Sequence, residues 1–408
     1  MKKYKLAILA SHPIQYQTPL FKKITENSQI DLMVYFNWDF GVGEESFADE
    51  FGKKIKWDIP ILEGYKYKFL KNFFLKPSDI FFGQINLGII KELVINNYDA
   101  VVVFGWNSFT NWLVFLTKFI HRTRIILQSE SPLNQELLKS KWKIKIKKII
   151  LGWLFKHISA FLYIGEENKK FYQFYDIPEE KLFFAPYAVD NDRFIKAGKS
   201  LMENRNDLRN KIGIAENDAV ILFVGKMIEK KHPMDLLKAY ELMISNQELV
   251  TSNQGKVKNA NSHLIFVGDG ILRAELERYV KENNLKNLHF AGFKNQTELP
   301  QYYALADIFV LPSGIGETWG LVVNEAMCFS LLVIVSDVVG CGQDLVRQNE
   351  NGFVFLLGDI NKLAERLKEL AENKEKREQF GKKSFEIIQK YSYKKDIEGI
   401  LKALKIAN

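Results

Sequence analysis

Apolar runs of strand length alternate with helix-length segments along almost the whole of this 408-residue chain. The first half contains YKLAILA, IDLMVYF, DAVVVFG, RIILQS and AFLYIG, and the second half contains AVILFVG, HLIFVGDG, LHFAG, DIFVLPS and LLVIVSD. These runs are rich in Val, Ile, Leu and Phe without polar alternation, which is typical of parallel strands covered by helices on both faces. Two successive β-α-β series in a chain of this length predict an α/β fold with two doubly wound domains.

The composition of the chain indicates which cell compartment and which classes of partner are favoured. The apolar runs are shorter than the roughly 20 residues that span a bilayer, and the start, MKKYKLAILASHP, is typical of a first strand rather than of a signal peptide. Two cysteines, Cys328 and Cys341, provide neither a disulfide framework nor a metal site. These features favour the cytoplasm. The net charge of +8 favours anionic partners, but the lysines are dispersed and accompany no recognised motif, so we expect no nucleic acid partner.

One segment, LPSGIGETWGLVVNEAMCFS (residues 311–330), combines features of a ligand site. It leaves a predicted strand, passes through glycines and enters an apolar helix, and ligands of open parallel sheets bind beyond the carboxyl ends of strands. A helix N-terminus suits a phosphate, and the carboxylates of Glu317 and Glu325 could each accept the hydroxyls of a sugar or ribose diol. The alternative is that both glutamates are solvated or capping residues.

The block PSGIGETWGLVVNEAM resembles the signature of two glutamates separated by seven residues in retaining GT-B glycosyltransferases, chiefly family 4. LFVGKMIEKKHPMDLLKAY, LIFVGDGILRAELERYVKENNLKNLHFAGF and DLVRQNENGFVF resemble other segments of that family in the same order. The resemblance implies two facing Rossmann-like domains. We expect an acceptor-binding domain at residues 1–195, a donor-binding domain at 205–385, and C-terminal helices at about 386–408 that pack back on the first domain.

The resemblance also implies roles for residues that follow predicted strands. Lys226 and Lys231 would bind the donor diphosphate, although the family more often has Arg at the first of these positions. Glu317 would contact the donor sugar, and Glu325 would bind the ribose diol. The other expected donor contacts are Gly268, Asp269, Gly270, Gly292, Phe293, Thr318, Trp319, Gly320 and Leu321.

Loops after strands of the first half supply the expected acceptor contacts. His12, Gln15 and Tyr16 follow the first strand, and Trp106 and Asn107 follow a later one. Aromatic faces suit sugar rings, but a structural His12 and a core-packing Trp106 are the alternatives. Glu130, which follows RIIL, is expected to position the acceptor hydroxyl, unless it caps the next helix.

The segment of residues 138–158, LKSKWKIKIKKIILGWLFKHI, is basic and amphipathic. Such a helix can lie on an anionic membrane surface. The alternative is a helix whose apolar face packs on the sheet. One helical face carries Trp142, Ile146, Ile149, Ile150 and Trp153.

The sequence thus predicts a retaining glycosyltransferase that moves a sugar from a nucleotide-diphosphate donor, expected to be a UDP sugar, to a glycan or lipid-linked acceptor. Its expected place is the synthesis of surface polysaccharide or lipopolysaccharide, in the cytoplasm or peripherally on the inner face of the membrane. We predict no metal and no cofactor, and we interpret DND (residues 190–192) as a turn. The alternatives are a dinucleotide-dependent oxidoreductase, which lacks the required glycine spacing, and a two-lobed sugar-binding protein without catalysis.

Overall fold

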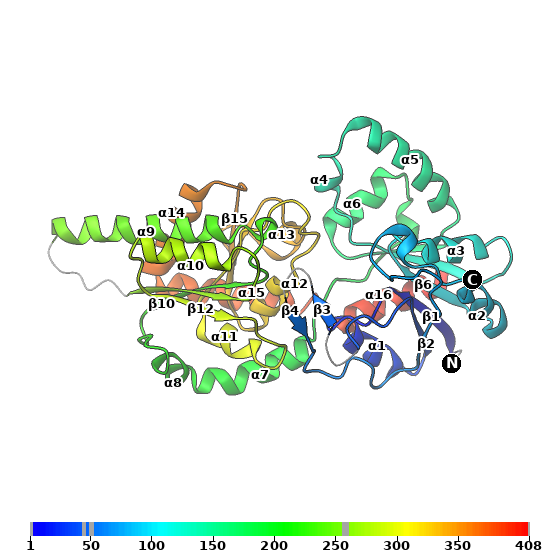
Figure 1. Cartoon of the computed structure of the whole chain (residues 1–408), viewed down its shortest axis with the longest axis horizontal. Coiled ribbons are helices and arrows are strands. Elements are labelled where there is room, and N and C mark those ends of the chain that lie inside the picture. Colours follow the sequence, from blue (N-terminus) through cyan, green and yellow to red (C-terminus); the bar gives the residue numbers. More distant parts are fainter. Residues whose placement is uncertain (1–2, 43–45, 49–52, 255–260, 407–408) are drawn as a thin grey trace. The chain divides into compact units, whose positions relative to one another are not determined.

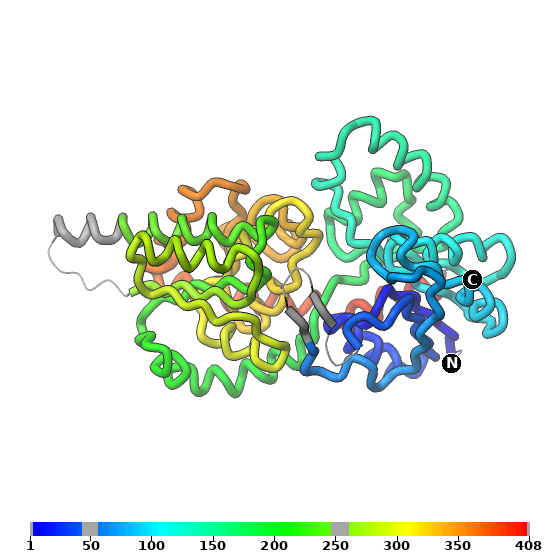
Figure 2. The backbone as a smooth tube through the Cα atoms, viewed as in Figure 1, coloured from blue at the N-terminus to red at the C-terminus, as the bar shows by residue number. Residues whose placement is uncertain are grey.

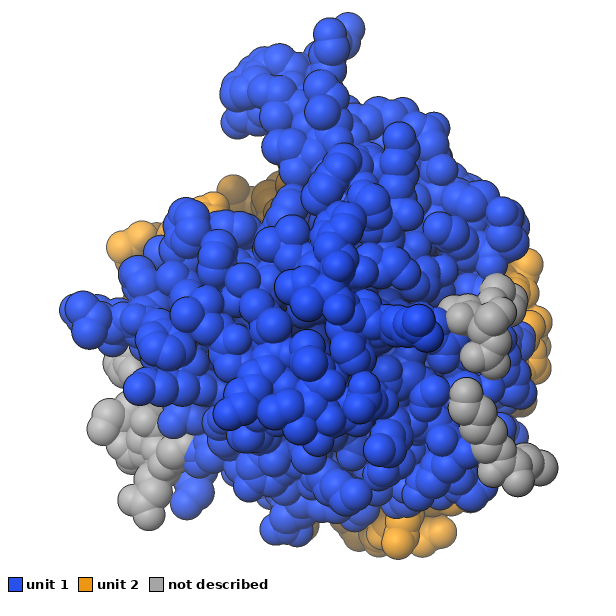
Figure 3. All heavy atoms as spheres, turned by 90° about the vertical axis from the view of Figure 1, so that its right-hand side faces the viewer, with its two compact units in different colours: residues 1–46, 55–190, 391–408 blue, residues 47–54, 191–390 orange. Residues whose placement is uncertain are grey.

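The computed structural model describes residues 3–42, 46–48, 53–254 and 261–406, and the chain can be followed from blue to red in Figure 2. It divides into two compact units, which Figure 3 distinguishes by colour. Unit 1 comprises residues 1–46, 55–190 and 391–408, and unit 2 comprises residues 47–54 and 191–390. The main chain therefore enters unit 2 after Asp190 and returns to unit 1 at Tyr391.

The centre of unit 1 is a seven-stranded parallel sheet with the strand order β5-β2-β1-β6-β7-β8-β9. The register between its first two strands runs from Tyr4 opposite Ile30 to Ala10 opposite Phe36. Its strands are β1 (Tyr4–Ala10), β2 (Ile30–Phe36), β5 (Tyr67–Phe69), β6 (Ala100–Phe104), β7 (Arg124–Gln128), β8 (Ala160–Tyr163) and β9 (Leu182–Phe184).

Helices cover both faces of this sheet, and alternate residues of β1 enter different cores. Leu6 and Ile8 pack with residues of α1 and α16, whereas Ala7 and Leu9 pack with residues of α2, α3, α5 and α6. This two-residue period is the geometry of a strand buried on both faces. The helices are α1 (Thr18–Thr25), α2 (Gly88–Asn96), α3 (Phe109–Thr117), α4 (Leu133–Glu136), α5 (Lys141–Lys156), α6 (Glu166–Phe174) and α16 (Tyr393–Ile406).

Unit 2 contains a six-stranded parallel sheet with the strand order β12-β11-β10-β13-β14-β15. Its strands are β10 (Ala219–Val224), β11 (Ser262–Val267), β12 (Leu288–Gly292), β13 (Ile308–Leu311), β14 (Leu332–Ser336) and β15 (Gly352–Phe355). In both sheets the strand order reverses direction once, between β1 and β6 in unit 1 and between β10 and β13 in unit 2. These are the switch points of doubly wound sheets, and the predicted α/β class with two such domains is confirmed.

Figure 1 shows α9, α10 and α14 on one side of the unit 2 strands and α7, α8 and α11 on the other. The residues around the expected boundary between the domains are largely helical, and α7 buries Phe194 and packs on α11 and α12. Residues 190–192 do not form the predicted turn, since α7 begins at Asn191. The helices are α7 (Asn191–Glu203), α8 (Arg205–Asn210), α9 (Pro233–Gln254), α10 (Arg273–Glu282), α11 (Leu299–Leu305), α12 (Leu321–Cys328), α13 (Gly342–Leu345), α14 (Ile360–Glu372) and α15 (Lys374–Ile388).

The remaining elements are short. A two-stranded sheet joins β3 (Ser46–Ala48) and β4 (Lys53–Ile55), and the 3-10 turns are η2 (Phe81–Gly83), η3 (Glu179–Lys181) and η4 (Glu229–Lys231). Across the described ranges, no helix combines the length and the apolar character needed to cross a membrane.

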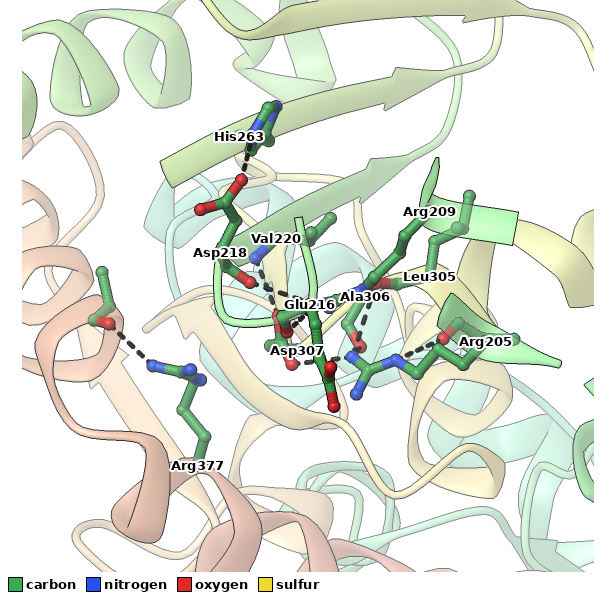
Figure 4. A network of polar contacts seen from close by, with 12 residues as sticks. Arg205, Arg209, Glu216, Asp218, Val220, His263, Leu305, Ala306, Asp307 and Arg377 are labelled. Atoms are coloured by element: carbon green, nitrogen blue, oxygen red, sulfur yellow. Dashed lines mark hydrogen bonds and ion pairs between the residues drawn. The ribbon is translucent and has the colours of Figure 1, made fainter. Parts of the chain in front are cut away.

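A buried ionic network ties α8 to the sheet of unit 2 (Figure 4). The Asp307 carboxylate accepts hydrogen bonds from Arg205, from Arg209 and from the backbone N–H of Val220, each at 2.7–2.8 Å. Arg209, which is only 2% exposed, also donates to the carbonyls of Leu305 and of two residues just before β10. The arginine thereby satisfies backbone groups that would otherwise be buried without hydrogen bonds.

Candidate active site

The donor residues predicted from the sequence lie at the carboxyl ends of strands in the unit 2 sheet or in the loops and the helix α12 that follow them. Lys226 follows β10, residues 268–270 follow β11, Phe293 follows β12, and residues 312–320 follow β13. These strands are neighbours and parallel, so their carboxyl ends meet at one edge of the sheet. The two loops that carry the lysines and the glutamates flank the switch point between β10 and β13. Ligands of open α/β sheets bind at such a point.

Contacts between these two loops hold their charged side chains together. Lys231 donates to the carboxylate of Glu317, and both side chains are largely buried, at 15% and 11% exposure. The backbone N–H of Gly314 donates to the carbonyl oxygen of Lys230 at 2.7 Å. This contact pairs Lys231, which is predicted to bind the donor diphosphate, with Glu317, which is predicted to contact the donor sugar.

Lys226 lies half-buried beside the same lysine cluster. Burial, together with the positive charges of Lys231 and Lys230, lowers its pKa to about 8, and the Glu317 carboxylate only partly opposes this. An anionic ligand would offset this repulsion and stabilise the charged form of Lys226. The cluster is therefore suited to a phosphate group.

The loop between β13 and α12 is fixed by its backbone. Gly320 has a φ of +99°, and a Cβ at this position would lie 2.8 Å from the Leu311 side chain, so the entry into α12 requires glycine. The carbonyls of Glu317 and Trp319 accept hydrogen bonds at 3.0 Å from the N–H groups of residues 340 and 341. The indole of Trp319 is 2% exposed and donates to Asn324 at 2.9 Å. A ligand contact by this tryptophan would thus come from its backbone.

Glu325 lies in α12 and is 7% exposed. Its carboxylate accepts a 2.6 Å hydrogen bond from the Tyr303 hydroxyl and another from Gln296, whose own side chain is bound by Arg193 at 2.6 Å. Burial raises the pKa of Glu325 to about 7, although these donors and the Arg193 charge act in the opposite direction. Since Glu317 is also largely buried, neither glutamate is a solvated residue, which was one of the two alternatives; the other was a capping role.

The glycines after β11 have a packing role of their own. A Cβ on Gly268 would lie 1.9 Å from the carbonyl oxygen of Gly225 after β10, so the two loops can approach this closely only without a side chain. Asp269 accepts hydrogen bonds from the N–H of Gly270 at 3.0 Å and from Arg273 at 3.5 Å. Gly292 and Phe293, at the end of β12, are partly exposed, and Arg273 also lies beside Gly292.

In unit 1, the loop after β1 lies at the other switch point. His12 is in edge-to-face contact with Trp38 and Phe40, with ring centroids 5.7 and 5.2 Å away, and its Nδ1 is 3.1 Å from the Ser11 hydroxyl. Burial lowers the pKa of His12, with a smaller opposing effect from Asp79. The surroundings of the imidazole, which include two aromatic rings, therefore favour its neutral form.

Tyr187 links two of the predicted acceptor residues. Its hydroxyl donates to the Glu130 carboxylate at 2.5 Å, and its ring is in edge-to-face contact with Tyr16 at 5.6 Å. The carbonyl of Tyr16 accepts a 2.8 Å hydrogen bond from Tyr393 of α16. This chain of contacts orients Glu130 and anchors the loop after β1. Tyr187 was not predicted as a site residue, because it follows β9, a strand that was not predicted.

The other acceptor candidates differ in their surroundings. Trp106 stacks on Phe171 at 5.8 Å, and the ammonium of Lys147 lies 5.5 Å from its ring, so core packing accounts for its position. Asn107 is exposed and Gln15 is partly exposed. Sequence reasoning missed Lys230, Arg193, Gln296 and Tyr303, which surround the predicted donor residues; only Lys230 had a local signal, as a neighbour of Lys231. Within the described ranges, no three His, Cys, Asp or Glu side chains are grouped as metal ligands.

Comparison with known proteins connects this geometry to a family. Residues 204–387 match the model of the family described as glycosyl transferases group 1. The chain is 30% identical over 197 residues, 48% of its length, to the UDP-Gal:alpha-D-GlcNAc-diphosphoundecaprenol alpha-1,3-galactosyltransferase of Escherichia coli. It is 31% identical over 234 residues, 54% of its length, to an uncharacterised glycosyltransferase of Methanocaldococcus jannaschii. These matches span 46% and 61% of the two relatives.

Solved structures extend the likeness of fold to the whole chain. The structure of HepE from Anabaena in complex with UDP and glucose superposes with a TM-score of 0.68 at 17% identity, covering 98% of this chain and 99% of that one. A sucrose-phosphate synthase from Thermosynechococcus elongatus gives a TM-score of 0.65 at 15% identity, covering 99% of this chain and 97% of that one. The two-domain α/β fold is that of GT-B proteins. The part of the chain that matches the group 1 glycosyl transferase family, residues 204–387, carries the lysine cluster and both glutamates.

Proposed function

We propose that the protein is a retaining glycosyltransferase that moves a sugar from a nucleotide-diphosphate donor, a UDP sugar, to a glycan or lipid-linked acceptor during surface polysaccharide synthesis. The observation that carries the proposal is the arrangement at the switch point of unit 2. Three lysines lie there within electrostatic reach of one another, with Glu317 bound to one of them. Two relatives also support it, since the E. coli enzyme is named for UDP-Gal and a diphosphoundecaprenol substrate, and HepE was solved with UDP.

On the donor side, Lys226 and Lys231 bind the diphosphate together with the first turn of α12, whose N–H groups have no carbonyl partner within the helix. Glu317 binds hydroxyls of the sugar, and Glu325 accepts both hydroxyls of the ribose. The residues at 268–270, 292–293 and 318–321 line the nucleotide and the sugar through their backbone. The burial of both glutamates supports these roles, because a desolvated carboxylate forms stronger hydrogen bonds than a solvated one.

In the reaction, the bond between the anomeric carbon and the diphosphate oxygen breaks, and the acceptor hydroxyl forms a new bond on the same face of the sugar. Its proton passes to the departing diphosphate. The lysines stabilise the negative charge that develops on this leaving group in the transition state. Stabilisation of such developing charge is usually the largest single contribution to catalysis. Glu130, oriented by Tyr187, positions the acceptor hydroxyl, and His12, Gln15, Tyr16 and Asn107 surround the acceptor.

The segment of residues 138–158 forms the contact with an anionic membrane. On α5, Trp142, Ile146, Ile149, Ile150 and Trp153 are 47–67% exposed, which leaves unpaired the apolar face that a sheet-packing helix would bury. Leu151, Leu154 and Phe155 pack inward instead. Lysines beside an exposed aromatic face favour an anionic lipid surface.

Thermal stability against a panel of UDP, GDP, ADP, their sugars and NAD tests the donor side. A ligand present at 100 times its Kd stabilises the protein by about 2.7 kcal/mol. We expect UDP and a UDP sugar to stabilise unit 2, Glu325→Gln to weaken this effect, and Glu350→Ala, a change at an exposed carboxylate paired with Arg347, to leave it unchanged. Stabilisation by NAD alone would favour the oxidoreductase. Binding of a UDP sugar without transfer to any diphosphoundecaprenol-linked or glycan acceptor would favour a sugar-binding protein.

A further inference from the structure

A pocket of about 480 Å³ opens on unit 1 between α5 and residues 175–181, which connect α6 to β9. Both of its walls immediately precede strands, since α5 leads into β8 and the connection leads into β9. The pocket therefore lies toward the amino-terminal edge of the sheet. The candidate acceptor residues lie at the carboxyl edge, so the pocket is separate from the site described above.

Positive charge predominates around this pocket. Lys148, Lys156 and Lys181 line it, and Asp176 is the carboxylate among its lining residues. Asp176 pairs with Lys148 at 3.3 Å, while Lys181 donates to a backbone carbonyl just beyond α5 at 3.2 Å. The nearby Glu179 pairs with a lysine of α6 at 2.5 Å. The pocket thus presents a net positive charge, which suits a ligand with at least one negative group.

Gly152 supports the idea that the pocket is a cavity for a ligand. This glycine lines the pocket from the middle of α5, where glycine lowers helix stability relative to alanine. Close packing explains the glycines inside two other long helices, because a Cβ on Gly381 of α15 or on Gly399 of α16 would lie 2.1 Å from a carbonyl oxygen. A Cβ on Gly152 would meet nothing within 4 Å. Packing does not require this glycine, and a larger side chain would occupy the pocket.

The rim of the pocket continues into an exposed apolar surface. Trp153 and Ile149 line the pocket and are 48% and 67% exposed. Phe119, just beyond α3 and 60% exposed, stacks on Trp153 with centroids 6.4 Å apart, and Ile120 beside it is 69% exposed. A contiguous apolar surface next to lysines is the composition of a surface that lies in the interface of a bilayer.

We propose that this pocket binds the phosphate-bearing head group of an anionic phospholipid. The lysines contact the phosphate, and Ile149 and Trp153 contact the glycerol and the start of the acyl chains, while the exposed face of α5 lies in the bilayer interface. The proposal rests on the membrane contact proposed above for α5, but it does not depend on sugar transfer, because the pocket lies in unit 1 and nucleotide binding is assigned to unit 2.

Flotation of the full-length protein with phosphatidylcholine vesicles, with and without phosphatidylglycerol, tests this site. We expect binding only with phosphatidylglycerol. Gly152→Phe should abolish most of it without changing the charge, whereas Gly152→Ala, which adds a single methyl group, should bind as the parent protein does. An unchanged circular dichroism spectrum and an unchanged thermal unfolding curve would show that each variant is folded and that any lost vesicle binding is specific to the pocket.

A matched pair of double variants separates the pocket from general attraction. Lys148→Ala with Lys156→Ala removes two charges that line the pocket, and Lys143→Ala with Lys145→Ala removes two exposed charges from the same helix outside it. Each lysine near an anionic surface contributes roughly a fivefold effect on affinity, so both pairs should weaken binding. The proposal requires a loss at least about tenfold greater for the pocket pair.

Two results would overturn the proposal. One is equal loss in the two double variants together with normal binding by Gly152→Phe, which would indicate diffuse attraction along α5. The other is stabilisation of the protein by inorganic phosphate to the same extent as by short-chain phosphatidylglycerol, without vesicle binding. That result would assign the pocket to a free phosphate compound.

Discussion

Replacing Lys226 by arginine should remove one limb of the pH dependence of nucleotide binding. Burial and the charges of Lys231 and Lys230 lower the pKa of Lys226 to about 8, so this ammonium group loses its proton within the working range of most enzymes. Arginine stays protonated at every pH of interest. The substitution Lys226→Arg therefore keeps the positive charge and abolishes its titration.

The size of the effect follows from the titration curve. If the diphosphate binds only when Lys226 is charged, a pKa of about 8 raises the apparent Kd about twofold at pH 8 and about elevenfold at pH 9, relative to the Kd of the fully charged form. The sign is fixed: affinity falls as the pH rises through the pKa of the free protein. In Lys226→Arg the Kd should stay constant between pH 7.5 and about pH 9.

Isothermal titration of UDP into both proteins across this range measures the effect. Lys230→Arg, which changes the exposed neighbour, serves as the control and should retain the parental pH dependence. A parental protein whose Kd does not change between pH 7.5 and 9 would refute the reasoning. So would a Lys226→Arg variant that loses affinity to the same extent as the parent.

Three further changes test other parts of the structure. Arg209→Met should destabilise unit 2 by about 3–5 kcal/mol in urea unfolding, because Asp307 loses a buried partner; a change below about 1 kcal/mol would show that the network contributes little. Asp396→Asn should stabilise the protein at pH 8 and not at pH 4. Burial raises the pKa of this carboxyl from 3.8 to about 8, so the parent loses up to about 5 kcal/mol as the pH rises through that window, and a pH-independent difference would contradict this. Tyr187→Phe should raise the acceptor KM about 5- to 30-fold by freeing Glu130, while UDP binding, measured by titration, stays unchanged.

The sequence predicted every interior strand of the two large sheets and one edge strand, β12. β5, β9 and β15 were missed, and all three are edge strands of three or four residues. Of these, β5 has two exposed residues out of three, whereas β9 and β15 are mostly buried. Periodicity reports burial on both faces, so exposure explains why β5 was missed. β9 and β15 were missed because three or four residues show almost no period.

Helix α5 shows a different limit of sequence reasoning. The helix was predicted from its period, but the sequence could not determine which apolar residues face the protein. Two apolar stripes compete on this helix. The structure buries Leu151, Leu154 and Phe155 and leaves Trp142 and Trp153 exposed. The choice depends on the core formed by α3 and α6, which are distant in sequence.

The candidate donor site was predictable in its residue types but not in its protonation. Glu325 could be selected because it follows a strand, a glycine loop and a helix start, all of which are local features. Its partners Tyr303, Gln296 and Arg193 lie 22 or more residues away, and only folding brings them together. Their effect is chemical as well as geometric, because the site combines a carboxyl with a pKa of about 7 and an ammonium with a pKa of about 8.

These two pKa values define a narrow pH range in which both predicted ligands are charged. Below pH 7 Glu325 takes up a proton and loses one acceptor for the ribose diol, and above pH 8 Lys226 loses the charge that attracts the diphosphate. Nucleotide affinity should therefore be greatest between pH 7 and 8 in the parent protein. Because the two residues act on different parts of the nucleotide, Lys226→Arg should remove only the alkaline decline and Glu325→Gln only the acidic one. A single substitution that removed both declines would mean that the two groups titrate as one coupled pair rather than as separate ligands.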